Sequence, residues 1–169
     1  KFEPSQTLKT IAFAFTAIGV VTFFVGALKN PAGMWPAYLT AFFYVSLLGL
    51  GGLFWASINN IAKAGWSVSI RRIAEGFTSF IPVMLFGSLV LVVGFKYLYP
   101  WARPEDVASS ELIKAKVGYL NTGSVVIRML IFGIGAWVFR NKIVGNSIKQ
   151  DSNGDETYTH KNVAMSIAY

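Results

Sequence analysis

The stretch GYLNTGSVVIRMLIFGIGAWVFR, from Gly118 to Arg140, decides the fold class because it is almost entirely apolar and yet contains an arginine. A membrane core about 30 Å thick needs about 20 apolar residues at 1.5 Å of rise each. The stretch has that length, so it predicts a membrane-spanning helix over 119–139. Arg128 lies at its middle, and the nearest charged residues on either side are Lys116 and Arg140.

Composition places the whole chain in the same class. Of its 169 residues 54% are hydrophobic, 15% are aromatic and only 14% are charged. The apolar share is above the usual range for soluble domains, which need more charged surface. The composition therefore predicts a membrane protein.

Three further segments have the length and hydropathy of a span, at 11–28, 35–59 and 77–99. Lys29 and Asn30-Pro31 close the first, Pro36 lies in the first turn of the second, and Pro100 closes the third. The first is longer than a signal-peptide core, and ALKNPAG is a poor cleavage site. We therefore expect an all-α polytopic membrane protein with a bundle of four transmembrane helices.

The segments outside the spans complete the expected organisation. Residues 1–10 are interpreted as a cytoplasmic N-terminus and residues 140–161 as a polar cytoplasmic loop. Residues 162–169, NVAMSIAY, are interpreted as the start of a further helix, which would make the chain the N-terminal bundle of a longer protein. The alternative interpretation is that these last residues form a loose tail.

Orientation follows from the basic residues that flank the spans. The side of the N-terminus carries nine: Lys1, Lys9, Lys63, Arg71, Arg72, Arg140, Lys142, Lys149 and Lys161. The opposite side carries five: Lys29, Lys96, Arg103, Lys114 and Lys116. Because cytoplasmic loops carry the excess of Lys and Arg, the count predicts a cytoplasmic N-terminus.

Small residues recur at helical spacing along the spans, which is typical of close helix contacts in lipid. The first span has such a stripe at Ala12, Thr16, Gly19 and Gly26. The stripes predict either a tight bundle or contact with another subunit. Pro82 removes a backbone donor and predicts a kink near the start of the third span.

Arg128 shares one helical face with Asn121, Ser124 and Gly135. An arginine within the membrane core is costly, so we expect it to face protein or water. None of the four predicted spans contains a carboxylate, so its partner must be backbone carbonyls, water, lipid phosphate or an acid elsewhere. Three roles remain open: a structural pair, a polar or proton pathway that includes Asn121, Ser124 and Tyr44, and direct contact with a quinone or substrate.

A second charged group lies in AGWSVSIRRIAEGF, residues 64–77, between the second and third spans. Glu75 follows Arg71 by four residues and Arg72 by three, a spacing that predicts an ion pair on a helix. The structural interpretation is that this pair fixes the start of the third span. Contact with anionic lipid or a cytoplasmic partner is the alternative.

Several chemistries are excluded or disfavoured by the residues present. The chain has no cysteine and one histidine, His160, so it cannot by itself hold a thiolate-ligated iron–sulfur cluster or a bis-histidine haem. It has no phosphate-binding loop motif and no His-Glu-x-x-His motif. The net charge of +7 is spread over span ends rather than gathered in one run, so we expect no nucleic-acid partner. We predict no catalytic, metal or cofactor residue in this chain.

AGWSVSIRRIAEGF, together with KVGYLNTGSVVIRMLIFGIGAW at 116–137, resembles one family of membrane proteins. The family is the ActF membrane subunit of bacterial alternative complex III, with its paralogue ActC, among the NrfD/PsrC-like membrane subunits. The resemblance covers roughly residues 11–139. It implies a longer protein of two four-helix bundles.

The resemblance also implies a place in the bacterial inner membrane and a role in respiratory electron transport. The complex oxidises menaquinol and passes electrons through iron–sulfur clusters and haem c on partner subunits. An ActF-like chain would be a scaffold and candidate proton path without redox cofactors, beside an ActC-like quinol subunit. The alternatives are a quinol-binding ActC/NrfD-type subunit and half of a membrane transporter.

Overall fold

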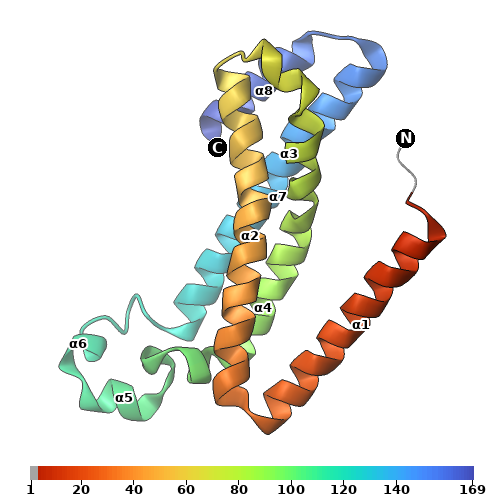
Figure 1. Ribbon diagram of the computed structural model, residues 1–169. Helices are drawn as coiled ribbons and strands as arrows, with labels where there is room; N and C mark the ends of the chain where they lie inside the picture. The colour runs from red at the N-terminus through yellow and green to blue at the C-terminus, as the bar shows by residue number, and fades with distance from the viewer. Residues whose placement is uncertain (1–3) are drawn as a thin grey trace.

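The computed structural model describes residues 4–169, and this part of the chain consists of helices and short connections without a strand. Four helical segments are long and apolar enough to cross a membrane. They are α1 (Gln6–Lys29), α2 (Pro31–Ile61), the α3–α4 run (Arg71–Leu98) and α7 (Thr122–Asn153). The predicted all-α fold with four spans is confirmed, and the chain is a membrane protein (Figure 1).

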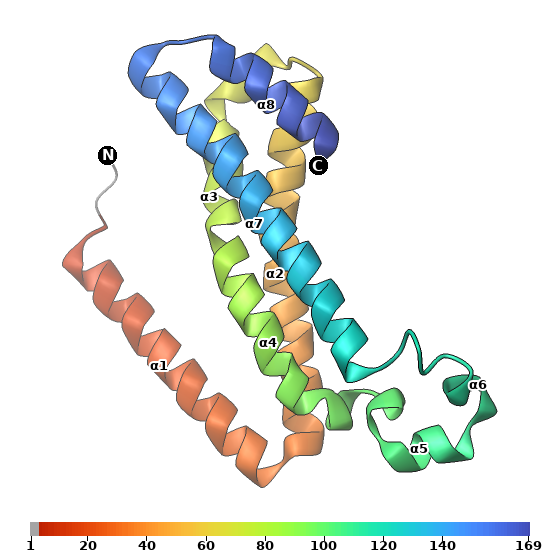
Figure 2. The same cartoon turned by 180° about the vertical axis from the view of Figure 1, so that it is seen from behind.

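The remaining elements are short and lie at the two ends of the long helices (Figures 1 and 2). The connection from α2 to α4 contains η1 (Gly65–Ser69), α3 (Arg71–Phe77) and η2 (Thr78–Phe80), and α4 covers Ile81–Leu98. The opposite end has η3 (Pro100–Ala102), α5 (Pro104–Ser109) and α6 (Glu111–Lys114). Helix α8 (Thr157–Ala168) folds back beside α7.

The helices α2, α4 and α7 form the packed part of the molecule. Its buried core consists of Leu53, Ile81, Ala136 and Ile143. The helices come close where a glycine faces a large side chain, since a Cβ atom at Gly94 would overlap the indole ring of Trp35. Close approach at small residues is the usual way in which helices associate in lipid, where apolar side chains gain nothing by leaving the lipid.

Helix α1 diverges from this bundle. Asn30 alone separates it from α2, and its side chain accepts a hydrogen bond of 3.2 Å from the N–H of Gly33 to cap α2. Near this turn Phe23 packs against Trp35 with ring centroids 5.5 Å apart, and beyond it α1 leans away (Figures 1 and 2). No residue of α1 is buried, and a Cβ atom at Gly19 would meet nothing within 4 Å. Gly26, near the turn, packs against the side chain of Met34, whereas the part of the small-residue stripe at Ala12, Thr16 and Gly19 is exposed in the described part of the chain.

At Pro82, where a kink was expected, the helix changes type. Pro82 lies in the first turn of α4, where its missing N–H leaves no bond unmade. The preceding residues Thr78–Phe80 form a single 3₁₀ turn that joins α3 to α4. The α-helical run from Arg71 to Leu98 is therefore interrupted just before Pro82.

The prediction of a polar loop over 140–161 is wrong for most of its length. Helix α7 continues to Asn153 because Ile143, Val144 and Ser147 are buried against neighbouring helices. It ends at Gly154, whose φ of +69° suits the left-handed cap and whose N–H bonds to the Gln150 carbonyl at 2.8 Å. The helix expected over 162–169 begins earlier, at Thr157.

Candidate functional site

The strongest concentration of charge lies where α3 meets the extended end of α7. Glu75 on α3 accepts from Arg72 Nη1, and its other oxygen lies 3.6 Å from Arg71 Nε. Asp151 on α7 faces the same two arginines, with its Oδ1 3.4 Å from Arg71 Nη2 and its Oδ2 bonded to Arg72 Nη2. Two cations and two carboxylates thus form a neutral four-residue cluster, which we call the arginine–carboxylate cluster.

Burial makes this cluster more than a surface ion pair. The Glu75 side chain is 4% exposed, whereas that of Asp151 is 53% exposed. Arg72 also donates to the Ser147 carbonyl at 3.2 Å, and the buried Thr78 hydroxyl donates to the Glu75 carbonyl at 2.6 Å. A buried carboxylate without its cations would carry a large desolvation cost. The cluster therefore ties α3 to α7 across the end of the bundle.

Helix α8 is held at the same end by polar side chains. Asn162 is 4% exposed, donates to the Ile143 carbonyl at 3.0 Å and accepts from Asn146 at 2.9 Å. Ser166 accepts from Asn60 of α2 at 3.2 Å. Buried amides with both groups bonded give a defined orientation rather than a loose contact. Helix α8 is thus part of the packed structure.

A polar groove of about 680 Å³ lies between α8 and the α2–α3 connection. Basic and acidic side chains both line it, including Lys63, Arg71, Asp151, Glu156 and His160. The pKa of the nearby Asp155 carboxyl is held below its ordinary value, chiefly by hydrogen bonding from Thr157. The mixed charges of the groove favour water and small polar solutes over an apolar ligand.

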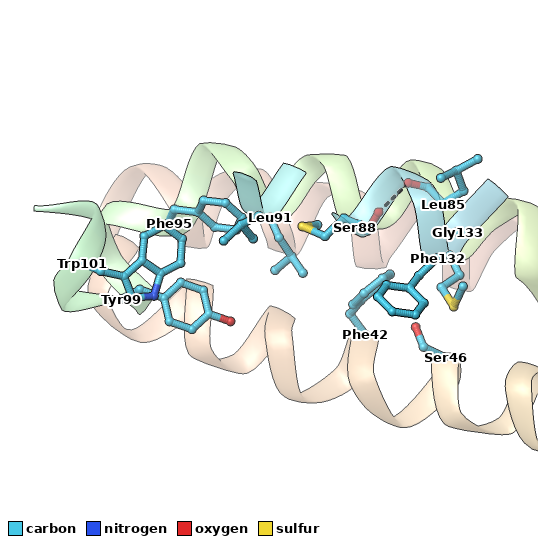
Figure 3. A pocket seen from close by; sticks show the side chains of 13 residues that line it. Phe42, Ser46, Leu85, Ser88, Leu91, Phe95, Tyr99, Trp101, Phe132 and Gly133 are labelled. Atoms are coloured by element: carbon cyan, nitrogen blue, oxygen red, sulfur yellow. Dashed lines mark hydrogen bonds between the residues drawn. The ribbon is translucent and has the colours of Figure 1, made fainter. Parts of the chain in front are cut away.

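A second cavity lies at the depth of the membrane, between α2, α4 and α7 (Figure 3). Its volume is about 410 Å³, within the range of small-ligand pockets. Most of its lining is apolar, and Ser46 and Ser88 are the hydroxyl-bearing residues well inside it. Ser88 donates to the Leu85 carbonyl at 2.7 Å, whereas the Ser46 hydroxyl is buried without a hydrogen-bond partner. The cavity thus offers one free donor in an apolar setting.

Aromatic rings bound one end of this cavity (Figure 3). Tyr99 and Trp101 stack with centroids 5.0 Å apart, and Phe95 meets both edge-on at 5.6 and 5.3 Å. Tyr and Trp prefer the boundary between lipid and water. The cavity therefore runs from that boundary toward the middle of the bundle.

Arg128 does not line this cavity. It lies six residues after the first residue of α7, so its Cα is about 9 Å along the helix from Thr122. Its guanidinium donates to the Tyr119 carbonyl at 2.9 Å and to Ser124 Oγ at 3.0 Å, and lies 3.8 Å from the centre of the Tyr119 ring. The side chain thus reaches back to the nearer helix end, as expected of an arginine at that depth.

Of the other residues in the predicted polar pathway, Asn121 and Ser124 lie near Arg128 and Tyr44 does not. Asn121 caps α7 by accepting from the Ser124 N–H at 2.8 Å, and it donates to the Val117 and Gly118 carbonyls. With Arg128 it forms a local network at the start of α7. Tyr44 lies on α2, is 64% exposed and lines none of the cavities described above. The structure brings Asn121, Ser124 and Arg128 together and leaves Tyr44 apart.

Two site residues were missed by sequence reasoning. Asp151 was assigned to a loop, because a polar segment hides its helical register until Ile143, Val144 and Ser147 are recognised as one face. Ser46 has no distinguishing sequence signal, since a serine in a span usually bonds to its own helix. Within residues 4–169, no group of three or more His, Asp or Glu residues is placed to hold a metal ion.

Fold and site together define an all-α polytopic membrane protein with a charged cluster at one end and an apolar cavity within the bundle. Comparison with protein-family models and with curated proteins finds no match to this chain.

Proposed function

We propose that this chain is an integral membrane subunit of a bacterial respiratory quinol:cytochrome c oxidoreductase of the alternative complex III type. In this proposal it carries no redox cofactor and acts as a scaffold beside an ActC-like quinol-oxidising subunit. Menaquinone, haem c and iron–sulfur clusters belong to the partner subunits. The chain lies in the inner membrane with its N-terminus in the cytoplasm.

The observation that carries the proposal is the exposed N-terminal part of the small-residue stripe of α1, at Ala12, Thr16 and Gly19. A Cβ atom at Gly19 would meet nothing within 4 Å, and no residue of α1 is buried. Small residues in a membrane helix allow another helix to approach closely, and within residues 4–169 no atom beyond its own helix lies within 4 Å of a Cβ placed at Gly19. A helix of another subunit fits that face, in agreement with the sequence resemblance.

A scaffold role is favoured over a proton path through Arg128. Proton transfer along side chains needs groups that exchange partners, whereas Asn121 and Ser124 are engaged in capping and in local bonds to Arg128. Tyr44 is exposed elsewhere on α2. Arg128 would then stabilise the start of α7 for contact with a neighbouring subunit.

Purification of the tagged protein from its native membrane in a mild detergent tests the proposal. We expect c-type haem and iron–sulfur proteins to co-purify with it, together with quinol:cytochrome c reductase activity. Gly19→Leu should weaken this co-purification, whereas Gly51→Leu, at an exposed glycine of α2 with nothing within 4 Å, should leave it intact. Recovery of the protein as a monomer without haem-containing partners would overturn the proposal.

The cavity of Figure 3 favours a second candidate function, binding of quinol by this chain itself. It is apolar, begins at an aromatic boundary and holds the unbonded Ser46 hydroxyl, which could donate to a quinone oxygen. A photoreactive menaquinol analogue should then label α2 or α4 in the intact complex. Labelling of partner subunits alone would reject this candidate and leave the scaffold proposal standing.

A further inference from the structure

An open groove of about 860 Å³ lies between α3 and α7, on the outer side of the arginine–carboxylate cluster. Val144 and Ile148 contribute apolar surface, and its polar groups come from Arg72, Glu75, Ser79, Arg140, Asp151 and Ser152. The groove is separate from the apolar cavity of Figure 3, with which it shares no lining residue.

Some charged groups of the groove are paired with opposite charges within the described part of the chain, and Arg140 is not. Glu75 and Asp151 are neutralised by Arg71 and Arg72 in the arginine–carboxylate cluster. Among residues 4–169 Arg140 has no carboxylate partner, and the one hydrogen bond that its side chain makes to them is from Nη1 to Asn141 Oδ1 at 2.9 Å. Its Nε is buried without a hydrogen-bond partner. The groove therefore carries one unbalanced positive charge with unused donors.

The position of Arg140 indicates what kind of anion can reach it. Arg140 directly follows the apolar part of α7, which ends at Val138 and Phe139. Such a site lies at the level of the lipid headgroups. Basic grooves between transmembrane helices at this level suit the phosphate of anionic lipids, whose acyl chains continue along the apolar helices.

Exposed apolar side chains continue from the groove toward the membrane core. On α4, Val83 and Phe86 follow Ser79 at helical spacing and are 54% and 70% exposed. On α7, Trp137 precedes Arg140 by three residues and is 42% exposed. A cationic headgroup site above exposed apolar surface matches a phospholipid better than a free soluble anion.

We propose that the groove between α3 and α7 binds one anionic phospholipid, with its phosphate on Arg140. The Arg72 guanidinium, held in place by Glu75 and Asp151, forms the wall opposite Arg140. The bound lipid would bridge α3 and α7 on the side that the arginine–carboxylate cluster leaves open. This site is independent of the proposed respiratory role.

Native mass spectrometry of the purified protein released from nanodiscs tests the site. Nanodiscs of phosphatidylglycerol mixed with phosphatidylcholine should yield one retained phosphatidylglycerol per chain. Arg140→Gln should weaken its retention about five-fold, the effect of one basic residue at an anionic lipid surface. Arg140→Lys should keep most of the binding.

Lys142→Gln is the matched control, because Lys142 is exposed, lies two residues further on and so occupies a different face of α7. It should leave retention unchanged. Equal losses for Arg140→Gln and Lys142→Gln would show general attraction to the membrane surface and overturn the site. So would displacement of the lipid by millimolar inorganic phosphate. Unchanged unfolding of Arg140→Gln in detergent establishes that a loss of lipid is not a loss of fold.

Discussion

Arg71 Nη2 lies 3.4 Å from Asp151 Oδ1, although 80 residues separate them in the chain. The contact joins α3, at the start of the third span, to the end of α7, the fourth. Arg72 makes the parallel contact to the other oxygen of Asp151, and Glu75 completes the cluster from within α3. The two carboxylates differ greatly in exposure, which separates their expected energetic roles.

Glu75→Gln should destabilise the protein far more than Asp151→Asn. Removing the buried carboxylate leaves two arginines without their inner partner, a loss of about 3 kcal/mol. Removing the half-exposed Asp151 carboxylate should cost no more than about 1 kcal/mol. Unfolding by denaturant in detergent, followed by circular dichroism, measures both. Glu111→Gln, at the start of α6, is the control, and equal losses for Glu75→Gln and Asp151→Asn would contradict the difference in burial.

Gly94→Ala should destabilise the bundle by about 2 kcal/mol, because the added methyl group overlaps the Trp35 ring. Trp35→Leu in the same chain should recover part of that loss, since it vacates the space. Gly135→Ala provides the matched control, with nothing within 4 Å of the new Cβ atom. The unaltered protein, Gly94→Ala, Trp35→Leu and the double variant form a double-mutant cycle measured by thermal unfolding, and Gly135→Ala is measured beside them. An additive double variant would mean that the two residues do not contact.

Asn162→Ala should release α8 from the bundle. The change removes hydrogen bonds to the Ile143 carbonyl and to Asn146 at a buried position, a loss of about 1–3 kcal/mol. Faster amide hydrogen exchange confined to residues 157–168 is the expected result. His160→Ala, two residues earlier and exposed, should leave exchange unchanged. Exchange that is already fast in the unaltered protein would contradict the packing of α8.

An arginine at the membrane centre costs about 3 kcal/mol of insertion free energy. Arg128→Leu should improve the insertion of α7 by less than this amount. The reason is that Arg128 already reaches the Tyr119 carbonyl and ring near the helix end. A translocon insertion assay on residues 116–142 measures the difference. We also expect Arg128→Leu to weaken assembly of the proposed complex while all four spans still insert.

Single cysteines test the orientation, and the absence of native cysteine makes the labelling specific. Ser69 lies in the α2–α3 connection and Ser152 at the end of α7, at one end of the molecule, whereas Ser109 lies at the other (Figure 1). With a cytoplasmic N-terminus, a membrane-impermeant maleimide added to intact cells should label Ser109→Cys alone. Labelling of Ser69→Cys and Ser152→Cys instead would indicate the opposite orientation, with the N-terminus outside the cytoplasm.

The spans could be predicted from sequence because length and hydropathy alone determine them. The end of the first span before Asn30-Pro31 was also readable, but α2 begins at Pro31, so Pro36 lies inside this helix and not in its first turn as predicted. The extension of α7 to Asn153 could not be predicted from the sequence. Its polar residues resemble a loop until the burial of Ile143 and Ser147 is known. Hydropathy carries no information on which helix a buried serine will face.

Among the candidate site residues, local contacts could be predicted from the sequence, and contacts between distant segments could not. The pairing of Glu75 with Arg71 and Arg72 is local and depends on helical spacing, so the sequence contained it. Asp151 joins them only through tertiary packing across 80 residues. Arg128 was placed on a shared face with Asn121 and Ser124, which is local, but the direction of its long side chain depends on where α7 begins.

The splay of α1 has a consequence for the lipid around the molecule. A helix that stands apart from a bundle is bordered by lipid on nearly all sides, so this chain has a longer perimeter than a closed four-helix bundle of equal size. Association that covers α1 returns those ordered lipids to the bulk membrane. Part of the free energy of assembly therefore comes from the release of lipid and not from protein contacts. The lipid composition of the membrane then affects how strongly the subunits associate.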